Sequence, residues 1–140
     1  MALKTLPTKT SARTLITALP DQKRADALLL LKIFTDATGM KPVVWGTSII
    51  GFGKYHYESQ RSAQKGDWPL VAFASRATGF TIYIMPGFGE YKALLAKLGP
   101  HKISGGSCLY IKRLAGVHVP TLTTLIKRST KEMQKKYGAA

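Results

Sequence analysis

The chain has 140 residues, which suits one domain and is too short for two separate hydrophobic cores. Hydrophobic residues make up 45% of it and charged residues 20%, so the composition excludes a disordered chain. Twenty-one Lys and Arg against seven Asp and Glu give a formal net charge of +14, which favours anionic partners, although a solvated basic surface without a dedicated partner explains the same charge.

Two helices are expected early in the chain. Thr10 or Ser11 can cap a short amphipathic helix that ends at Pro20. Asp21 can cap a second, longer helix with a wide apolar stripe, and Gly39 is placed to end it. The wide stripe indicates that the second helix is well buried.

Strand-like segments rich in β-branched and aromatic residues fill the middle of the chain and recur near its end. They are Val43–Trp45, Ile49–Tyr57, Trp68–Ser75, Phe80–Met85 and Cys108–Lys112. Their short connections imply antiparallel pairing. Gly51 and Gly53 lie two residues apart on one strand, which indicates a bulge or the close approach of another group.

Two further helices are expected at Glu90–Leu98 and Val119–Tyr137, and a Gly-Ser loop at Ser104–Ser107. The element order is then α-α-β-β-β-α-β-α. It predicts an α+β fold: one two-layer domain over residues 10–137, with an antiparallel sheet of about four or five strands and helices packed on one face. Residues 1–9 are polar and basic and predict a flexible arm.

Several blocks in this order resemble the signature of the YdhG-like family, a bacterial domain of unknown function (DUF1801). They are Trp45–Gly53 with Tyr55–Tyr57, Gly66–Leu70, Tyr83–Phe88, Leu98–Lys102 and Ser107–Leu114. The resemblance implies a single α+β domain. It also implies an uncharacterised activity, with an iron-chaperone or frataxin-like role named for some relatives.

A ligand cleft is the leading functional hypothesis. The chain has more polar-tipped aromatic residues than an inert core needs, and basic and hydroxyl residues accompany them. The candidate ligand-binding residues are Trp45, Ser48, His56, Tyr57, Trp68, Tyr83, Lys102, Ser104, Tyr110 and Lys112. They predict a non-enzymatic module that binds a small anionic or aromatic ligand or a protein; simple packing of the sheet against its helices is the alternative explanation.

Non-specific nucleic-acid binding is a second hypothesis. Basic residues concentrate at the two ends of the chain, where they could follow phosphates. They are Lys4, Lys9 and Arg13 in the arm and its continuation, and Lys127, Arg128, Lys131, Lys135 and Lys136 in the final helix. No known nucleic-acid-reading motif accompanies them.

Metal and catalytic chemistry find little support. His56, Glu58 and Asp67 are weak metal-ligand candidates that one hairpin could bring together, but the chain's charge opposes an iron carrier. Cys108 lies among apolar neighbours, which indicates an inert thiol rather than a nucleophile. No catalytic constellation and no cofactor are predicted.

The single cysteine excludes an internal disulfide and fits a reducing compartment. Residues 1–9 contain no continuous apolar region of a signal peptide. The longest apolar run, Ala27–Leu31, is far shorter than the roughly 20 residues that span a bilayer. A cytoplasmic protein with no membrane partner is therefore expected, as a monomer or a homodimer.

Overall fold

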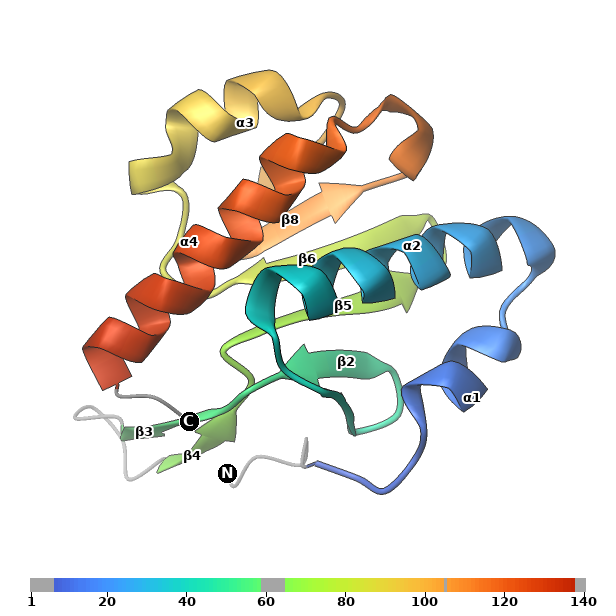
Figure 1. Ribbon diagram of the computed structural model, residues 1–140, viewed down its shortest axis with the longest axis horizontal. Coiled ribbons are helices and arrows are strands. Elements are labelled where there is room, and N and C mark those ends of the chain that lie inside the picture. The colour runs from blue at the N-terminus through green and yellow to red at the C-terminus, as the bar shows by residue number, and fades with distance from the viewer. Residues whose placement is uncertain (1–6, 59–64, 105, 138–140) are drawn as a thin grey trace.

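A six-stranded antiparallel sheet with helices on one face forms the core of the computed structural model, which describes residues 7–58, 65–104 and 106–137 (Figure 1). In spatial order the strands are β1 (Pro42–Trp45), β2 (Ile49–Phe52), β5 (Val71–Arg76), β6 (Gly79–Ile84), β8 (Cys108–Ile111) and β7 (Lys102–Ser104). A separate hairpin pairs β3 (Tyr55–Glu58) with β4 (Lys65–Trp68).

The helices form the second layer. They are α1 (Ala12–Thr17), α2 (Asp21–Thr38), α3 (Lys92–Leu98) and α4 (Val119–Tyr137), with short 3-10 turns at Gly89–Tyr91 and Leu114–Gly116. Figure 1 shows α2 and α4 side by side across the strands, with α3 against α4. The predicted α+β fold is confirmed. No helix in the described part of the chain is long and apolar enough to cross a membrane.

Successive side chains of a strand point to opposite faces of the sheet, so one set of apolar side chains faces the helices. Phe52, Phe73, Ile82 and Leu109 are among these residues, and all are almost fully buried. Phe34 of α2 lies at the centre, with its ring centroid 5.4 Å from that of Phe52 and 4.9 Å from that of Phe73. Such aromatic pairs add about 0.5–1.5 kcal/mol each to the gain from burial.

Two predicted strands are each split in the structure. The segment Ile49–Tyr57 breaks at Gly53, whose φ of 67° turns the chain out of the sheet and into the β3–β4 hairpin. The segment Trp68–Ser75 breaks at Pro69, which has no N–H to donate to a strand partner. The main sheet also gains β7, which precedes the expected Gly-Ser loop and overlaps it at Ser104, so the sheet has six strands rather than four or five.

Two helix-end predictions have different outcomes. Gly39 ends α2 in the left-handed conformation, with φ of 68°, as predicted. The prediction that Asp21 caps α2 is wrong, because Pro20 occupies the cap and Asp21 is the first helical residue. Its carboxylate pairs instead with the Arg24 guanidinium at 3.0 Å.

Part of the predicted basic arm lies against the sheet. Pro7 forms an isolated antiparallel bridge with Trp45, and the Thr8 amide donates to the Val44 carbonyl at 2.8 Å. The chain therefore follows the outer edge of β1 from residue 7 onward. Residues 1–6 of that arm lie outside the described residues.

Gly51 allows the close approach that its spacing with Gly53 predicted. A Cβ at Gly51 would lie 2.7 Å from Pro69 carbons and 2.8 Å from the Trp45 indole nitrogen. Pro69 and the Trp45 ring therefore pack directly on the bare backbone of β2. This contact covers the helix-free face of the sheet at β1 and β2.

Gly51→Ala should destabilise the protein by about 1–3 kcal/mol, since an added methyl group forces apart a closely packed proline and indole. Urea unfolding followed by circular dichroism measures this loss. Gly89→Ala is the matched control, because a Cβ there meets nothing within 4 Å. Equal stability of the Gly51→Ala variant and the unaltered protein would contradict the packing described.

The buried phenol of Tyr91 links the 3-10 turn that precedes α3 to the helix α4. Tyr91 is 2% exposed, and its hydroxyl donates to the Glu132 carboxylate. Burial, reinforced by that hydrogen bond and the carboxylate charge, raises the pKa of Tyr91 well above its ordinary value of about 10. The Arg128 guanidinium lies 5.6 Å from the centre of the same ring.

This raised pKa gives a stability contribution that is complete below about pH 10 and declines above it, because the unfolded chain releases its proton first. Tyr91→Phe should therefore lose less unfolding free energy between about pH 9 and 11 than the unaltered protein does. Chemical denaturation across that range measures the difference. Tyr137→Phe, at an exposed position on α4, is the control and should follow the unaltered protein.

Candidate functional site

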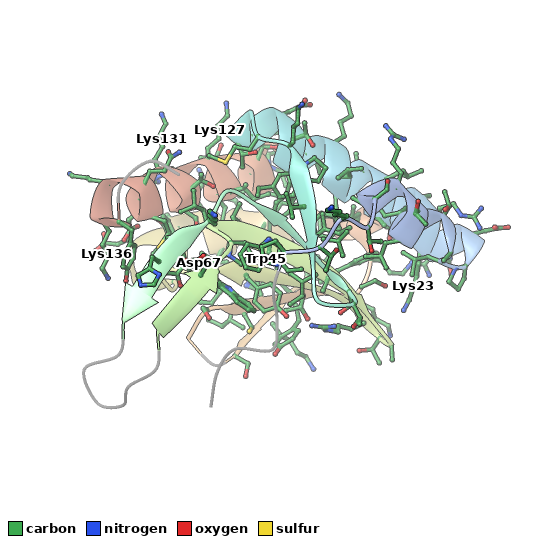
Figure 2. The ribbon with its side chains drawn as sticks, turned by 90° about the horizontal axis from the view of Figure 1, so that it is seen from below. Lys23, Trp45, Asp67, Lys127, Lys131 and Lys136 are labelled. Atoms are coloured by element: carbon green, nitrogen blue, oxygen red, sulfur yellow. The ribbon has the colours of Figure 1, made fainter. Side chains whose placement is uncertain are left out.

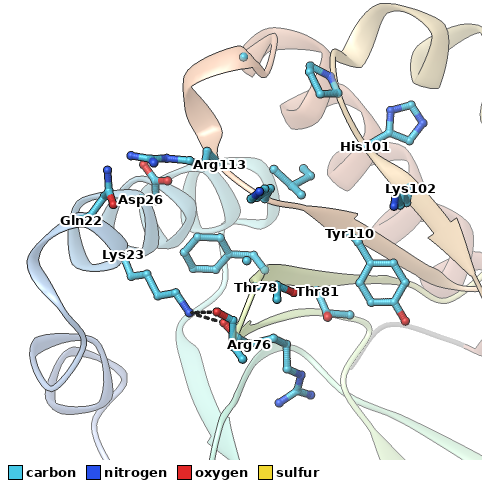
Figure 3. A pocket seen from close by; sticks show the side chains of 17 residues that line it. Gln22, Lys23, Asp26, Arg76, Thr78, Thr81, His101, Lys102, Tyr110 and Arg113 are labelled. Carbon is cyan, nitrogen blue, oxygen red and sulfur yellow. Dashed lines mark hydrogen bonds between the residues drawn. The ribbon is translucent and has the colours of Figure 1, made fainter.

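A basic groove of about 1090 Å³ lies at one end of the sheet. There the first turns of α2 pass the β5–β6 turn and the residues that follow β8 (Figure 3). Tyr110 lies toward one end of the groove and Lys23, Asp26 and Arg113 toward the other, with Thr78 and Thr81 between them.

Positive charge dominates the lining. Five cationic side chains contribute to it, with His101 in addition: Lys23, Arg76, Lys102, Lys112 and Arg113. The opposing carboxylate in the lining belongs to Asp26, and its Oδ2 already accepts a hydrogen bond from the Leu114 amide at 3.2 Å. The groove therefore has a strong excess of positive charge for an anion to neutralise.

Lys23 fastens α2 to the β5–β6 turn. Its ammonium group donates to the Arg76 carbonyl and, at 3.1 Å, to the Ala77 carbonyl (Figure 3). These bonds fix one wall of the groove by linking residues more than 50 positions apart in the chain.

Arg76 extends from the last position of β5 onto the helix-free face of the sheet. Its guanidinium donates to the Ser48 hydroxyl at 3.0 Å and to the Tyr83 hydroxyl at 2.8 Å. These two bonds orient the side chain, which is still exposed. A guanidinium has five N–H donors, so it keeps capacity for a planar or tetrahedral anion.

Tyr110 lies on the helix-free face beside Tyr83, whose hydroxyl accepts a hydrogen bond from Arg76. It is 40% exposed, and the register places Thr81 opposite it and Cys108 opposite Tyr83. The negative charge of the neighbouring Cys108 in its thiolate form raises the pKa of the Tyr110 phenol above its ordinary value of about 10. The phenol is a neutral hydrogen-bonding group at physiological pH.

A series of aromatic rings crosses the same face. The ring centroids of Trp45 and Trp68 are 6.3 Å apart, and those of Trp68 and Tyr83 are 6.1 Å apart in an edge-to-face arrangement. Trp45 is 1% exposed, whereas Tyr83 is half-buried and Tyr110 is exposed. Exposure thus increases from β1 toward β8.

The structure brings most of the predicted ligand residues together on this face or at the groove. Those residues are Trp45, Ser48, Trp68, Tyr83, Lys102, Ser104, Tyr110 and Lys112. His56 lies in the separate β3–β4 hairpin, where its Nδ1 is 3.1 Å from the Asp67 carboxylate. Tyr57 also belongs to β3, and its side chain lies outside the described residues.

Sequence reasoning missed Arg76, which lies just beyond the predicted strand Trp68–Ser75. The signal was available, because Ala72, Ala74 and Arg76 alternate along one strand and therefore share a face. Lys23 and Asp26 of α2 were also missed. They lie far in sequence from the strands that form the rest of the groove, and no local spacing links them to those strands.

The weak metal candidates do not form a cluster in the described part of the chain. His56 and Asp67 supply two neighbouring groups, and the Glu58 side chain is not described. No group of three or more His, Cys, Asp or Glu that could hold a metal ion occurs among the described residues.

The alternative nucleic-acid residues do not form one continuous surface. Lys127, Lys131 and Lys136 project from α4 (Figure 2), whereas exposed Lys9 and Arg13 lie before and within α1. Figure 1 shows α2 between α1 and α4. The remaining members of that set are exposed Arg128 and Lys135 on α4, and Lys4, which lies outside the described residues.

No family model, curated protein or solved structure matches this chain. The resemblance to the YdhG-like family remains a prediction. The function is therefore inferred from the groove and the helix-free sheet face themselves.

Gly79 forms part of the groove and allows β6 to start close to the end of β8. A Cβ there would lie 2.6 Å from the Ile111 carbonyl oxygen and 2.8 Å from the Lys112 Cα, and the φ of 154° also favours glycine. Gly79→Ala should therefore cost about 1–3 kcal/mol of stability. Amide hydrogen exchange in the Gly79→Ala variant should accelerate most at the end of β8. Accelerated exchange throughout the sheet, with β8 no different, would contradict this local effect.

Proposed function

We propose that this protein is a non-enzymatic binding module whose groove holds an anionic ligand that carries phosphate groups. The observation that carries the proposal is the groove lining: it contains five cationic residues and one carboxylate, which already accepts a hydrogen bond from the backbone. Such a lining disfavours a cation, and hence an iron-carrier role, through Coulomb repulsion.

Phosphate suits the groove better than a purely aromatic ligand. Arg76 is held in place by two hydroxyl groups, so binding an anion costs it little additional side-chain entropy. Lys112 and Lys102 add exposed charges, and Thr78 and Thr81 add hydroxyl groups at the same groove. Guanidinium, ammonium and hydroxyl donors are the groups that proteins use to bind phosphate oxygens.

Family membership is part of the proposal. Segments with the YdhG-like resemblance build much of this region: Trp45–Gly53, Tyr83–Phe88, Leu98–Lys102 and Ser107–Leu114. They include β2, β8, the end of β1, the end of β6 and the first residue of β7. The blocks thus supply Lys102, Tyr110 and Lys112 of the groove, whereas Lys23 and Arg76 lie outside them.

Tripolyphosphate should bind saturably at about 50 mM salt, where phosphate contacts are strong. Arg76→Ala and Lys112→Ala should each weaken its affinity about tenfold or more, since a hydrogen bond to a charged group contributes about 1.5–3 kcal/mol. Isothermal titration calorimetry measures both changes.

Lys127→Ala on α4 is the matched control, because it removes the same charge from an exposed position outside the groove. It should leave the affinity nearly unchanged. The absence of saturable binding, or an equal loss in all three variants, would reject the groove as the site.

A further inference from the structure

The groove opens onto an uncovered part of the sheet. Along β8 and β7 the helix-free face exposes Tyr110, Lys102 and Ser104. Tyr110 and Lys102 also line the groove, and they are directly paired across β7 and β8. The groove and this face are therefore one continuous surface.

Two tyrosine rings on this surface are placed like a stacking platform. Tyr83 and Tyr110 lie on neighbouring strands in diagonal positions, because Tyr83 is opposite Cys108 and Tyr110 is opposite Thr81. Diagonal positions on an antiparallel pair are about 7–8 Å apart. An extended strand whose bases are separated from one another can place successive bases on rings at this spacing.

Cations border the rings. Arg76 donates a hydrogen bond to the Tyr83 hydroxyl. Lys102 lies opposite Tyr110 in the register of β7 and β8, and Lys112 follows Tyr110 by two residues. A ligand lying on the tyrosines therefore meets positive charge on several sides. The groove volume of about 1090 Å³ slightly exceeds the usual range for small-molecule sites, about 300–1,000 Å³, which leaves room for more than one phosphate-bearing unit.

We propose that the groove and the β6–β8–β7 part of the helix-free face together bind a single strand of nucleic acid. Its phosphates contact Arg76, Lys102 and Lys112, and its bases stack on Tyr83 and Tyr110. This inference rests on the proposed phosphate-binding function and names the class of ligand.

A duplex fits this surface less well. Its bases are stacked on one another and present no free ring faces to a tyrosine, so a duplex gains only the phosphate contacts. Strong sequence preference is not expected, because phosphate contacts carry no sequence information and tyrosine rings stack on any base. The surface should accept many sequences, with affinity that falls steeply as salt rises.

The test compares an oligothymidylate of about 12 nucleotides with a duplex of the same length, by fluorescence anisotropy at about 50 mM salt. The single strand should bind more tightly than the duplex. Tyr110→Leu should weaken single-strand binding about tenfold, the usual order for loss of one stacked base, and should weaken duplex binding much less. Tyr110→Phe keeps the ring and should retain single-strand affinity.

Tyr137→Leu is the matched control, since Tyr137 is 43% exposed at the end of α4. It should not alter single-strand binding.

The unaltered protein gives an independent readout, because Cys108 is the only cysteine and is half-buried on the proposed surface. Bound oligothymidylate should slow alkylation of the Cys108 thiol by iodoacetamide, and bound duplex should slow this alkylation less.

Three outcomes would overturn the inference: duplex affinity equal to single-strand affinity, unchanged binding by Tyr110→Leu, or unprotected Cys108 at saturating oligonucleotide. Duplex binding that is lost in Lys127→Ala and Lys131→Ala variants would instead assign nucleic acid to α4. Tripolyphosphate binding without oligonucleotide binding would reject the nucleic-acid ligand and keep the proposed function. Loss of both would reject the phosphate site itself.

Discussion

Side chains alternate between the two faces of a β-sheet, and the helices of this chain cover only one face. Phe34 of α2 joins Phe52 and Phe73 on the covered face, and this packing fixes where α2 lies. The position of α2 in turn brings Lys23 to the β5–β6 turn and Asp26 to the Leu114 amide. The groove is therefore a consequence of how the hydrophobic core packs.

The helix-free face is divided into two parts with different roles. Near β1 and β2 it is closed by Trp45 and Pro69, which pack against the bare backbone of Gly51. Toward β8 and β7 nothing comparable covers the described residues, and Tyr110 is exposed beside Lys102. Arg76 lies between the two parts and bonds to Ser48 on one side and Tyr83 on the other. Arg76 thus links the closed part of the face to the open part.

The distribution of charge explains why the total of +14 is a poor guide to the site. The cations of α4 and of the start of the chain are the most obvious ones in the sequence, yet Figure 1 shows α2 between those two segments. The groove gathers its cations from α2, β5, β7 and the end of β8, each of which contributes only one or two. Convergence of charge, rather than its density along the chain, creates an anion site.

The sequence by itself determined the α+β class, the glycine at the end of α2, the close approach at Gly51 and most aromatic residues of the helix-free face. These features follow from local periodicity and backbone sterics, which a short stretch of sequence contains. Only the tertiary structure decided that Gly53 and Pro69 divide two strands, that β7 pairs with β8, and that Lys23, Arg76 and Arg113 share one groove. Those outcomes depend on contacts between residues distant in the chain, because long-range pairing and side-chain convergence leave no fixed spacing in the sequence.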